Sequence, residues 1–125
     1  MEAVLYVVNM PRCVAFYRFV LGLQVDRAED GFCVLSAPGT TLTLVQVPDH
    51  IAIGIQIGDP PERRSDTPIK LVFGVADIDA TRVLAAQSGG YIDGADAQWQ
   101  WAGTTRCDGV DPEGNVLQVS HGATP

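Results

Sequence analysis

The pattern of apolar and polar residues predicts a strand followed by a helix at the start of the chain. Residues 3–8 (AVLYVV) are almost wholly apolar, which predicts a strand buried on both faces. Asn9 is a favourable N-cap, and Pro11 fits the first turn of a helix. Apolar residues then recur at helical spacing as far as Gly22, a typical C-cap, so we expect an amphipathic helix of about three turns.

Alternation with a period of two follows this helix and predicts three strands. The expected strands span 23–28, 32–36 and 41–47. A further alternating run at 51–57 (IAIGIQI) either extends the sheet or lines a cleft. Prolines, charges and hydroxyl residues then mark 58–68 (GDPPERRSDTP) as an exposed linker.

The same order of elements returns after the linker. We expect a strand at 70–75, a helix at 80–87 capped by Asp77 or Asp79, a brief strand at 91–92, a long loop at 94–103, and strands at 104–110 and 116–120. The last two strands form a hairpin, because Pro112, Gly114 and Asn115 between them favour a turn.

This internal repeat predicts a single α+β domain over residues 1–125. It contains two βαβββ modules, at about 1–57 and 69–121, with the linker 58–68 between them. Their mixed, mostly antiparallel sheets are expected to curl against one another into a cup-shaped core.

Composition places the chain among globular proteins and limits its partners. Hydrophobic residues make up 46% of the chain and charged residues 18%. The net charge of −7 disfavours nucleic acid and anionic membranes, and favours neutral or cationic small molecules. No apolar run is long enough for a membrane helix, and no basic segment precedes the apolar N-terminus, so we expect a cytoplasmic protein. Cys13, Cys33 and Cys107 have no metal-binding spacing and are expected to be reduced residues of the core or strands.

Several short segments, in this order, resemble the vicinal oxygen chelate superfamily, which contains glyoxalases, extradiol dioxygenases and bleomycin-resistance-type binding proteins. The resembling segments are Val7-Val8-Asn9-Met10, Phe16-Tyr17, Leu21-Gly22-Leu23, Phe73-Gly74-Val75-Ala76-Asp77-Ile78-Asp79 and Asp111-Pro112-Glu113-Gly114-Asn115. Together they span nearly the whole chain. The resemblance implies a glyoxalase/bleomycin-resistance-like fold, in agreement with the repeat.

The superfamily's metalloenzymes place four metal ligands on the inner face of the cup. By local spacing, the resemblance carries those positions to Glu2, Thr43, Lys70 and Gln118, with Val45 or Gln46 as alternatives to Thr43. A threonine is a weak neutral donor, a lysine repels a cation and a glutamine is a poor ligand, so only Glu2 suits a divalent ion. We therefore expect no metal at this site.

Other residues do not replace the missing ligands. His50 is expected in a loop and His121 in the tail. Glu2 and Lys70 either form an ion pair across the cup or are separate, solvated side chains. A desolvated Lys70 would be able to act as a base or as a Schiff-base amine, but nothing else in the sequence supports that chemistry.

The two tryptophans point to a ligand. Trp99 and Trp101 alternate in a stretch that is otherwise small and polar, so both face one side of an extended segment. They either stack on a planar aromatic molecule at the mouth of the cup, or cover the core or a subunit contact. Arg106 is either a cation–π partner or an ordinary surface arginine. The candidate ligand-binding residues are Tyr6, Lys70, Trp99, Trp101, Arg106 and Gln118.

With its metal positions substituted, the chain is similar to the drug-binding branch of the superfamily, the bleomycin-resistance-type and mitomycin-binding-type proteins. That resemblance implies a homodimer that sequesters a small planar or aromatic molecule, such as an antibiotic, with no cofactor and no catalytic residue. The alternative is a glyoxalase- or dioxygenase-like lyase or isomerase with a non-standard site. A third interpretation is an interaction domain whose cup is filled by side chains.

Overall fold

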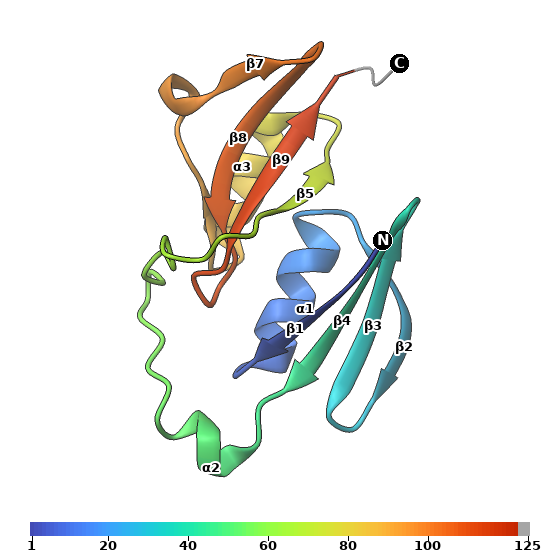
Figure 1. Cartoon of the computed structure of the whole chain (residues 1–125), viewed down its shortest axis with the longest axis vertical. Coiled ribbons are helices and arrows are strands. Elements are labelled where there is room, and N and C mark those ends of the chain that lie inside the picture. Colours follow the sequence, from blue (N-terminus) through green and yellow to red (C-terminus); the bar gives the residue numbers. More distant parts are fainter. Residues whose placement is uncertain (123–125) are drawn as a thin grey trace.

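The computed structural model of the protein describes residues 1–122 (Figure 1). The first half contains β1 (Glu2–Val7), α1 (Met10–Phe19), β2 (Gln24–Glu29), β3 (Phe32–Ala37), β4 (Thr40–Gln46) and the short helix α2 (Asp49–Ala52). The second half contains β5 (Leu71–Gly74), α3 (Ile78–Gln87), β6 (Tyr91–Ile92), the 3-10 helix η1 (Ala95–Ala97), β7 (Trp99–Trp101), β8 (Thr104–Val110) and β9 (Val116–His121). Within these residues, no helix is long and apolar enough to cross a membrane.

The strands form two sheets, one from each half of the chain. The first has four strands in the order β1-β4-β3-β2, and the second has five, in the order β5-β9-β8-β6 with β7 paired to β8. The pairs β1/β4 and β5/β9 are parallel, and the other pairs are antiparallel. Figure 1 shows α1 beside the first sheet and α3 behind the second. The predicted α+β fold of two repeated modules is therefore confirmed.

Both long helices lie where the sequence predicts, with small differences at their ends: the C-cap of α1 is Val20 and not Gly22, and α3 begins at Ile78 and not at residue 80. The side chain of Asn9 accepts a hydrogen bond from the Arg12 N–H at 3.2 Å, and that of Asp77 accepts one from the Ala80 N–H at 3.0 Å. Asp77, and not Asp79, is thus the cap of α3. After α1 the backbone turns at Gly22, where φ is +73°, a conformation that glycine adopts without steric cost.

Two expectations about strands are corrected, and one alternative that the sequence left open is decided. β1 is not buried on both faces, because Val4 and Tyr6 are 56% and 65% exposed. Residues 51–57 do not extend a sheet: they include the end of α2 and irregular chain, and Gln56 and Ile57 line a groove instead. The expected loop at 94–103 contains an additional short strand, β7, whose first and last residues are the two tryptophans.

A buried carboxylate from the second half holds the start of α1. Glu113 lies in the turn between β8 and β9 and is only 4% exposed. Its carboxylate accepts hydrogen bonds from the N–H groups of Val8, at 2.8 Å, and Asn9, at 2.7 Å, and from the Cys13 thiol at 3.2 Å. These groups surround the N-terminus of the helix, where the macrodipole also favours a negative charge. One side chain therefore joins the two halves of the chain.

A second buried carboxylate in the same turn completes this connection. Asp111 is fully buried and accepts hydrogen bonds from the Tyr17 hydroxyl at 2.7 Å and from the backbone N–H of Glu113 at 2.8 Å. Asn115 donates to it from both its backbone and its side-chain amide. Burial raises the pKa of Asp111 and, more strongly, the pKa of Tyr17, so the hydroxyl stays protonated as the donor.

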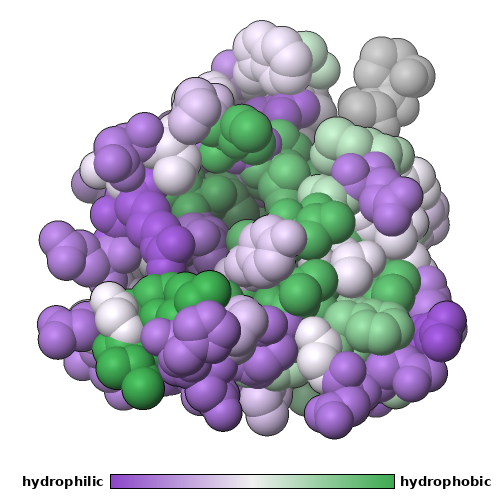
Figure 2. Space-filling model, turned by 60° about the horizontal axis from the view of Figure 1, so that its bottom comes forward, coloured by the Kyte–Doolittle hydropathy of each residue, from purple (hydrophilic) through white to green (hydrophobic). Residues whose placement is uncertain are grey.

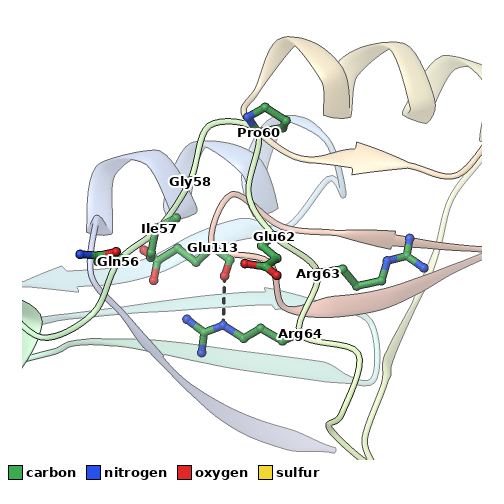
Figure 3. Close-up of a pocket in the computed structure, with 8 residues that line it drawn as sticks. All are labelled: Gln56, Ile57, Gly58, Pro60, Glu62, Arg63, Arg64 and Glu113. Carbon is green, nitrogen blue, oxygen red and sulfur yellow. Dashed lines mark hydrogen bonds between the residues drawn. The ribbon is translucent and has the colours of Figure 1, made fainter.

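The linker packs over this turn (Figure 3). Arg64 donates from its backbone N–H to the Gly114 carbonyl at 2.9 Å and from its Nε to the Glu113 carbonyl at 3.1 Å. Gly114 has φ +83°, and a Cβ there would lie 2.0 Å from the Glu62 carbonyl oxygen. A side chain at position 114 is therefore excluded by both conformation and space.

The three cysteines are free and buried, in agreement with the sequence. Burial and the neighbouring Glu113 carboxylate raise the pKa of the Cys13 thiol far above its usual range. Burial also raises the pKa of Cys33 and of Cys107.

The contact made by Glu113 predicts the effect of an isosteric substitution. In Glu113→Gln, one acceptor oxygen becomes an NH₂ group that faces N–H donors, which leaves buried donors unpaired. We expect the free energy of unfolding, measured by urea denaturation, to fall by about 1–3 kcal/mol. Glu62→Gln is the matched control, because it removes the same charge from an exposed glutamate. Equal stability of the two variants would contradict the role assigned to Glu113.

The cysteines provide a second test of the fold. Because the thiolate is the reactive form, a thiol reagent used near the ordinary cysteine pKa of about 8.5 should modify the folded protein far more slowly than a free thiol. In denaturant all three cysteines should react. Rapid modification of one cysteine in the folded state would show that its surroundings are more open than in this structure.

Candidate functional site

One face of the second sheet gathers most of the candidate ligand-binding residues. Gln118 on β9 lies opposite Val72 on β5 and opposite Asp108 on β8. Trp99 on β7 lies opposite Arg106 on β8. Directly paired residues project from the same face of a sheet, so these side chains form one surface. The opposite face is buried in the core and contains Phe73, Leu117 and Val119.

A continuous polar network crosses this face from β5 to β7. Lys70 Nζ lies 2.7 Å from Asp108 Oδ2, and Gln118 Nε2 donates to Asp108 Oδ1 at 3.2 Å. The other end of the same amide, Gln118 Oε1, accepts from Arg106 Nη1 at 2.9 Å. These contacts fix the orientation of the amide, because a flipped amide would place its NH₂ against the guanidinium. We call Lys70, Asp108, Gln118, Arg106 and Trp101 the network.

The network ends under an exposed indole. The guanidinium carbon of Arg106 lies 4.5 Å from the centroid of the Trp101 ring, within the range of a cation–π contact. Its Nε donates to Thr104 Oγ1 at 3.1 Å, which holds the plane of the guanidinium. Trp101 is 59% exposed and Trp99 is 37% exposed. Aromatic surface is thus fixed in place by polar contacts and remains open to solvent.

The short strand that carries both indoles is held by its turn. Ala102 and Gly103, which connect β7 to β8, have φ of +50° and +80°. The Thr104 hydroxyl donates to the Trp101 carbonyl across this turn. Because the strand pairs with β8 in register, the two tryptophans face the same side, as their spacing predicts.

The structure therefore brings four of the six candidate residues into one chain of contacts and places the other two differently. Lys70, Gln118, Arg106 and Trp101 belong to the network, and Trp99 lies beside it on β7. Tyr6 is on β1 of the first sheet, and within residues 1–122 no hydrogen bond or ring contact joins it to the network. The sequence analysis did not identify Asp108 as a candidate. Its position two residues after Arg106 in the same strand places both side chains on this face.

The open faces of the two sheets adjoin along β1 and β5. A cavity of about 250 Å³ between these strands lies mainly on their core side, because its wall includes Leu5, Tyr17, Leu71 and Leu117. Val4, Tyr6 and Val72 are all exposed on these faces. Figure 2 shows the mixture of apolar and polar side chains on one side of the molecule and a hollow with apolar side chains at its floor. The network face is therefore exposed to solvent within the described chain.

The four metal positions do not form a metal site. Glu2 and Thr43 lie on the first sheet, whereas Lys70 and Gln118 are engaged in the network. Across residues 1–122, no group of three or more His, Cys, Asp or Glu side chains is arranged to hold a metal ion. The set contains a cationic ammonium, a hydroxyl and an amide, which does not fit a divalent ion.

The carboxylate partner of Lys70 differs from the one considered from the sequence. Lys70 pairs with Asp108 and not with Glu2. The Lys70 Nζ is occupied by this contact with the carboxylate at 2.7 Å, so the structure does not support Lys70 as a free base or Schiff-base amine. Within residues 1–122, His121 contacts the Val75 carbonyl at 3.1 Å, and His50 lies in α2.

A separate groove of about 770 Å³ lies between the linker and the turn that contains Glu113 (Figure 3). Three of its charged groups are already engaged: Arg63 pairs with Asp93, Arg64 donates from its Nε to a carbonyl of the turn, and the Glu113 carboxylate is turned to α1. The fourth, Glu62, is exposed. Figure 3 shows Arg63 and Arg64 pointing in different directions. The lining of the groove contains no aromatic side chain, whereas the network ends at an exposed indole, so the network is the better candidate site.

Comparisons with solved structures agree with the fold. The chain matches a glyoxalase/bleomycin resistance protein/dioxygenase family enzyme from Burkholderia phytofirmans with TM-score 0.70 and 17% identity, covering 98% of this chain and 97% of that one. It matches a bleomycin-binding protein from Streptomyces verticillus, solved with copper(II)-bleomycin, with TM-score 0.59 and 17% identity over 98% and 95%. It also matches the fosfomycin resistance protein FosX from Mesorhizobium loti, with TM-score 0.67 and 10% identity, covering 98% of this chain and 91% of that one.

Sequence comparisons give the family. No curated protein sequence matches the chain. The family model described as a glyoxalase-like domain matches residues 2–120, which is almost the whole chain. With its two repeated modules and its similarity to solved glyoxalase/bleomycin resistance/dioxygenase structures, the chain belongs to the glyoxalase-like domain family.

Proposed function

We propose that the protein binds and sequesters a small planar aromatic molecule on the network face, without a metal ion or other cofactor. The observation that carries this proposal is the Trp101 indole, which is 59% exposed yet lies against a guanidinium that is itself hydrogen-bonded on two sides. A fixed aromatic surface of this kind binds a second ring with little loss of side-chain entropy.

The composition of the face supports this proposal. Two indoles supply apolar area, Val72 adds an aliphatic patch, and the network supplies polar groups that orient a ligand. Small-molecule sites commonly combine apolar walls with a few fixed polar groups. Offset stacking on an indole contributes about 0.5–1.5 kcal/mol beyond the burial of area.

The open geometry supports a homodimer as part of the proposal. The network face lacks a cover within the described chain, and exposed apolar residues continue onto the first sheet at Val4 and Tyr6. A second copy placed over these faces would enclose the ligand and bury Tyr6. The Streptomyces verticillus neighbour is named as a bleomycin-binding protein, which supports an antibiotic as the ligand. The role that we propose is sequestration of that ligand in the cytoplasm.

Removal of the indole tests the location of the site. In Trp101→Ala, we expect bleomycin or a quinoline-type aromatic to bind at least about tenfold more weakly, since the stacking surface is lost. Trp99→Ala should weaken binding as well. The matched control is Phe19→Ala, which removes a 61% exposed ring on α1. The measurement is a fluorescence titration, with calorimetry for the variants that lack one indole. Wild-type affinity in both tryptophan variants would contradict the proposal.

Metal addition and removal provide an independent test. Because Lys70 and Thr43 occupy two of the four family ligand positions, we expect chelator treatment to leave both Tm and ligand affinity unchanged. Zn²⁺, Mn²⁺ or Ni²⁺ added in excess should not raise Tm, since a ligand stabilises a protein only when it binds the folded state. The matched control is the same titration on Glu2→Gln. A stoichiometric metal in the purified protein, or loss of ligand binding on chelation, would instead favour a metalloenzyme.

A further inference from the structure

The Arg106 guanidinium is a half-buried cation that the described chain leaves without an anionic partner. Ion pairs within residues 1–122 join carboxylates to Arg12, Arg27, Arg63, Lys70 and Arg82, and Arg106 takes part in none of them. Its hydrogen-bond partners, Thr104 and Gln118, are both neutral. A guanidinium has five N–H donors, and only two of them are used by these contacts.

The carboxylate on the same face is not available to neutralise Arg106. Asp108 already pairs with the Lys70 ammonium at 2.7 Å and accepts from the Gln118 amide at 3.2 Å. The Gln118 amide lies between the Arg106 guanidinium and the Asp108 carboxylate, with its Oε1 toward Arg106 and its Nε2 toward Asp108. Lys70 and Arg106 contribute two positive charges to the network and Asp108 one negative charge, so the network has an excess of one positive charge.

This local excess is opposite in sign to the charge of the whole protein. A net charge of −7 led us to expect neutral or cationic ligands. The field close to a half-buried guanidinium is dominated by that group and by its immediate partners, because more distant surface charges are screened by solvent and salt. The planar guanidinium fork is also suited to two parallel hydrogen bonds with a carboxylate or phosphate.

We propose that the ligand is a planar aromatic molecule with an anionic oxygen group, such as a carboxylate, and that Arg106 binds this group. The proposal rests on the proposed function, which supplies the aromatic part. The ring stacks on the indole of Trp101 or Trp99, and the anionic group accepts from the free N–H groups of the guanidinium. Gln118 and Thr104 act as positioning residues, because they hold the plane of the guanidinium and do not touch the ligand's charge.

The test compares two probes that differ only in charge. 2-Naphthoate and 2-naphthamide present the same ring system, one with a carboxylate and the other with a neutral amide. Binding is followed by ¹⁵N NMR through the indole N–H signals of the chain's two tryptophans, which Trp99→Phe and Trp101→Phe assign. We expect the carboxylate to bind at least about tenfold more tightly than the amide.

Two arginine variants attribute the preference to one side chain. Arg106→Gln should remove the preference for the carboxylate. Because the guanidinium also supports the Trp101 ring, binding of both probes should weaken, and the readout is the ratio of their two affinities. Arg106→Lys keeps the charge but lacks the planar fork, so it should retain part of the preference. Arg18→Gln is the matched control, because Arg18 also lies over an aromatic ring, that of Phe19, but on the exposed side of α1. The control should bind both probes as the wild type does.

The possible outcomes separate this inference from the proposed function. Equal binding of both probes to the wild type would overturn the inference and leave an aromatic-binding face intact. A preference that persists in Arg106→Gln would overturn the assignment to Arg106. If neither probe shifts an indole signal, both the inference and the proposed function fail. Correct folding of each variant is checked by its backbone amide spectrum before titration.

Discussion

The Glu113 carboxylate is the interaction on which the arrangement of the molecule depends. It belongs to the turn of the last hairpin, yet it accepts the N–H groups of Val8 and Asn9 at the start of the first helix. Asp111, two residues earlier in the chain, accepts a hydrogen bond from the Tyr17 hydroxyl of the same helix. Both carboxylates are buried, and each is saturated by donors, which offsets the cost of desolvation. The second sheet is thereby held against the first module.

The same hairpin also positions the candidate site. The strands on either side of the turn carry Asp108 and Arg106 on one side and Gln118 on the other. The register of β8 and β9 places these side chains next to one another and so forms the chain of contacts from Lys70 to Trp101. The turn that joins the two modules therefore also positions the charged groups of the open face. Hydrogen bonds hold Asp108, Gln118 and Arg106 in fixed orientations, and the network ends at an aromatic ring and an incompletely used guanidinium.

The sequence predicts the fold well because its signals are local. Caps such as Asn9, turn residues such as Gly114 and the repeated order of elements all act within a few residues. The partners of Glu113 and the pairing of Lys70 with Asp108 depend instead on contacts between residues 38 to 105 positions apart, which a single sequence does not reveal. Alternation at 51–57 left a strand and the wall of a cleft as alternatives, and the structure has the end of α2 and irregular chain there. The apolar content around Tyr6 likewise does not distinguish a covered face of a strand from an open one.

The central claim is that the network face, and not the linker groove, is where this protein binds a small molecule. The most direct test is a map of backbone amide shifts across the chain at saturation with a planar aromatic acid. The account predicts that the largest shifts lie in β7, in β8 around Arg106 and at Gln118, with smaller changes near Lys70. Shifts concentrated instead at Gln56–Arg64 and Glu113, around the groove of Figure 3, would contradict it.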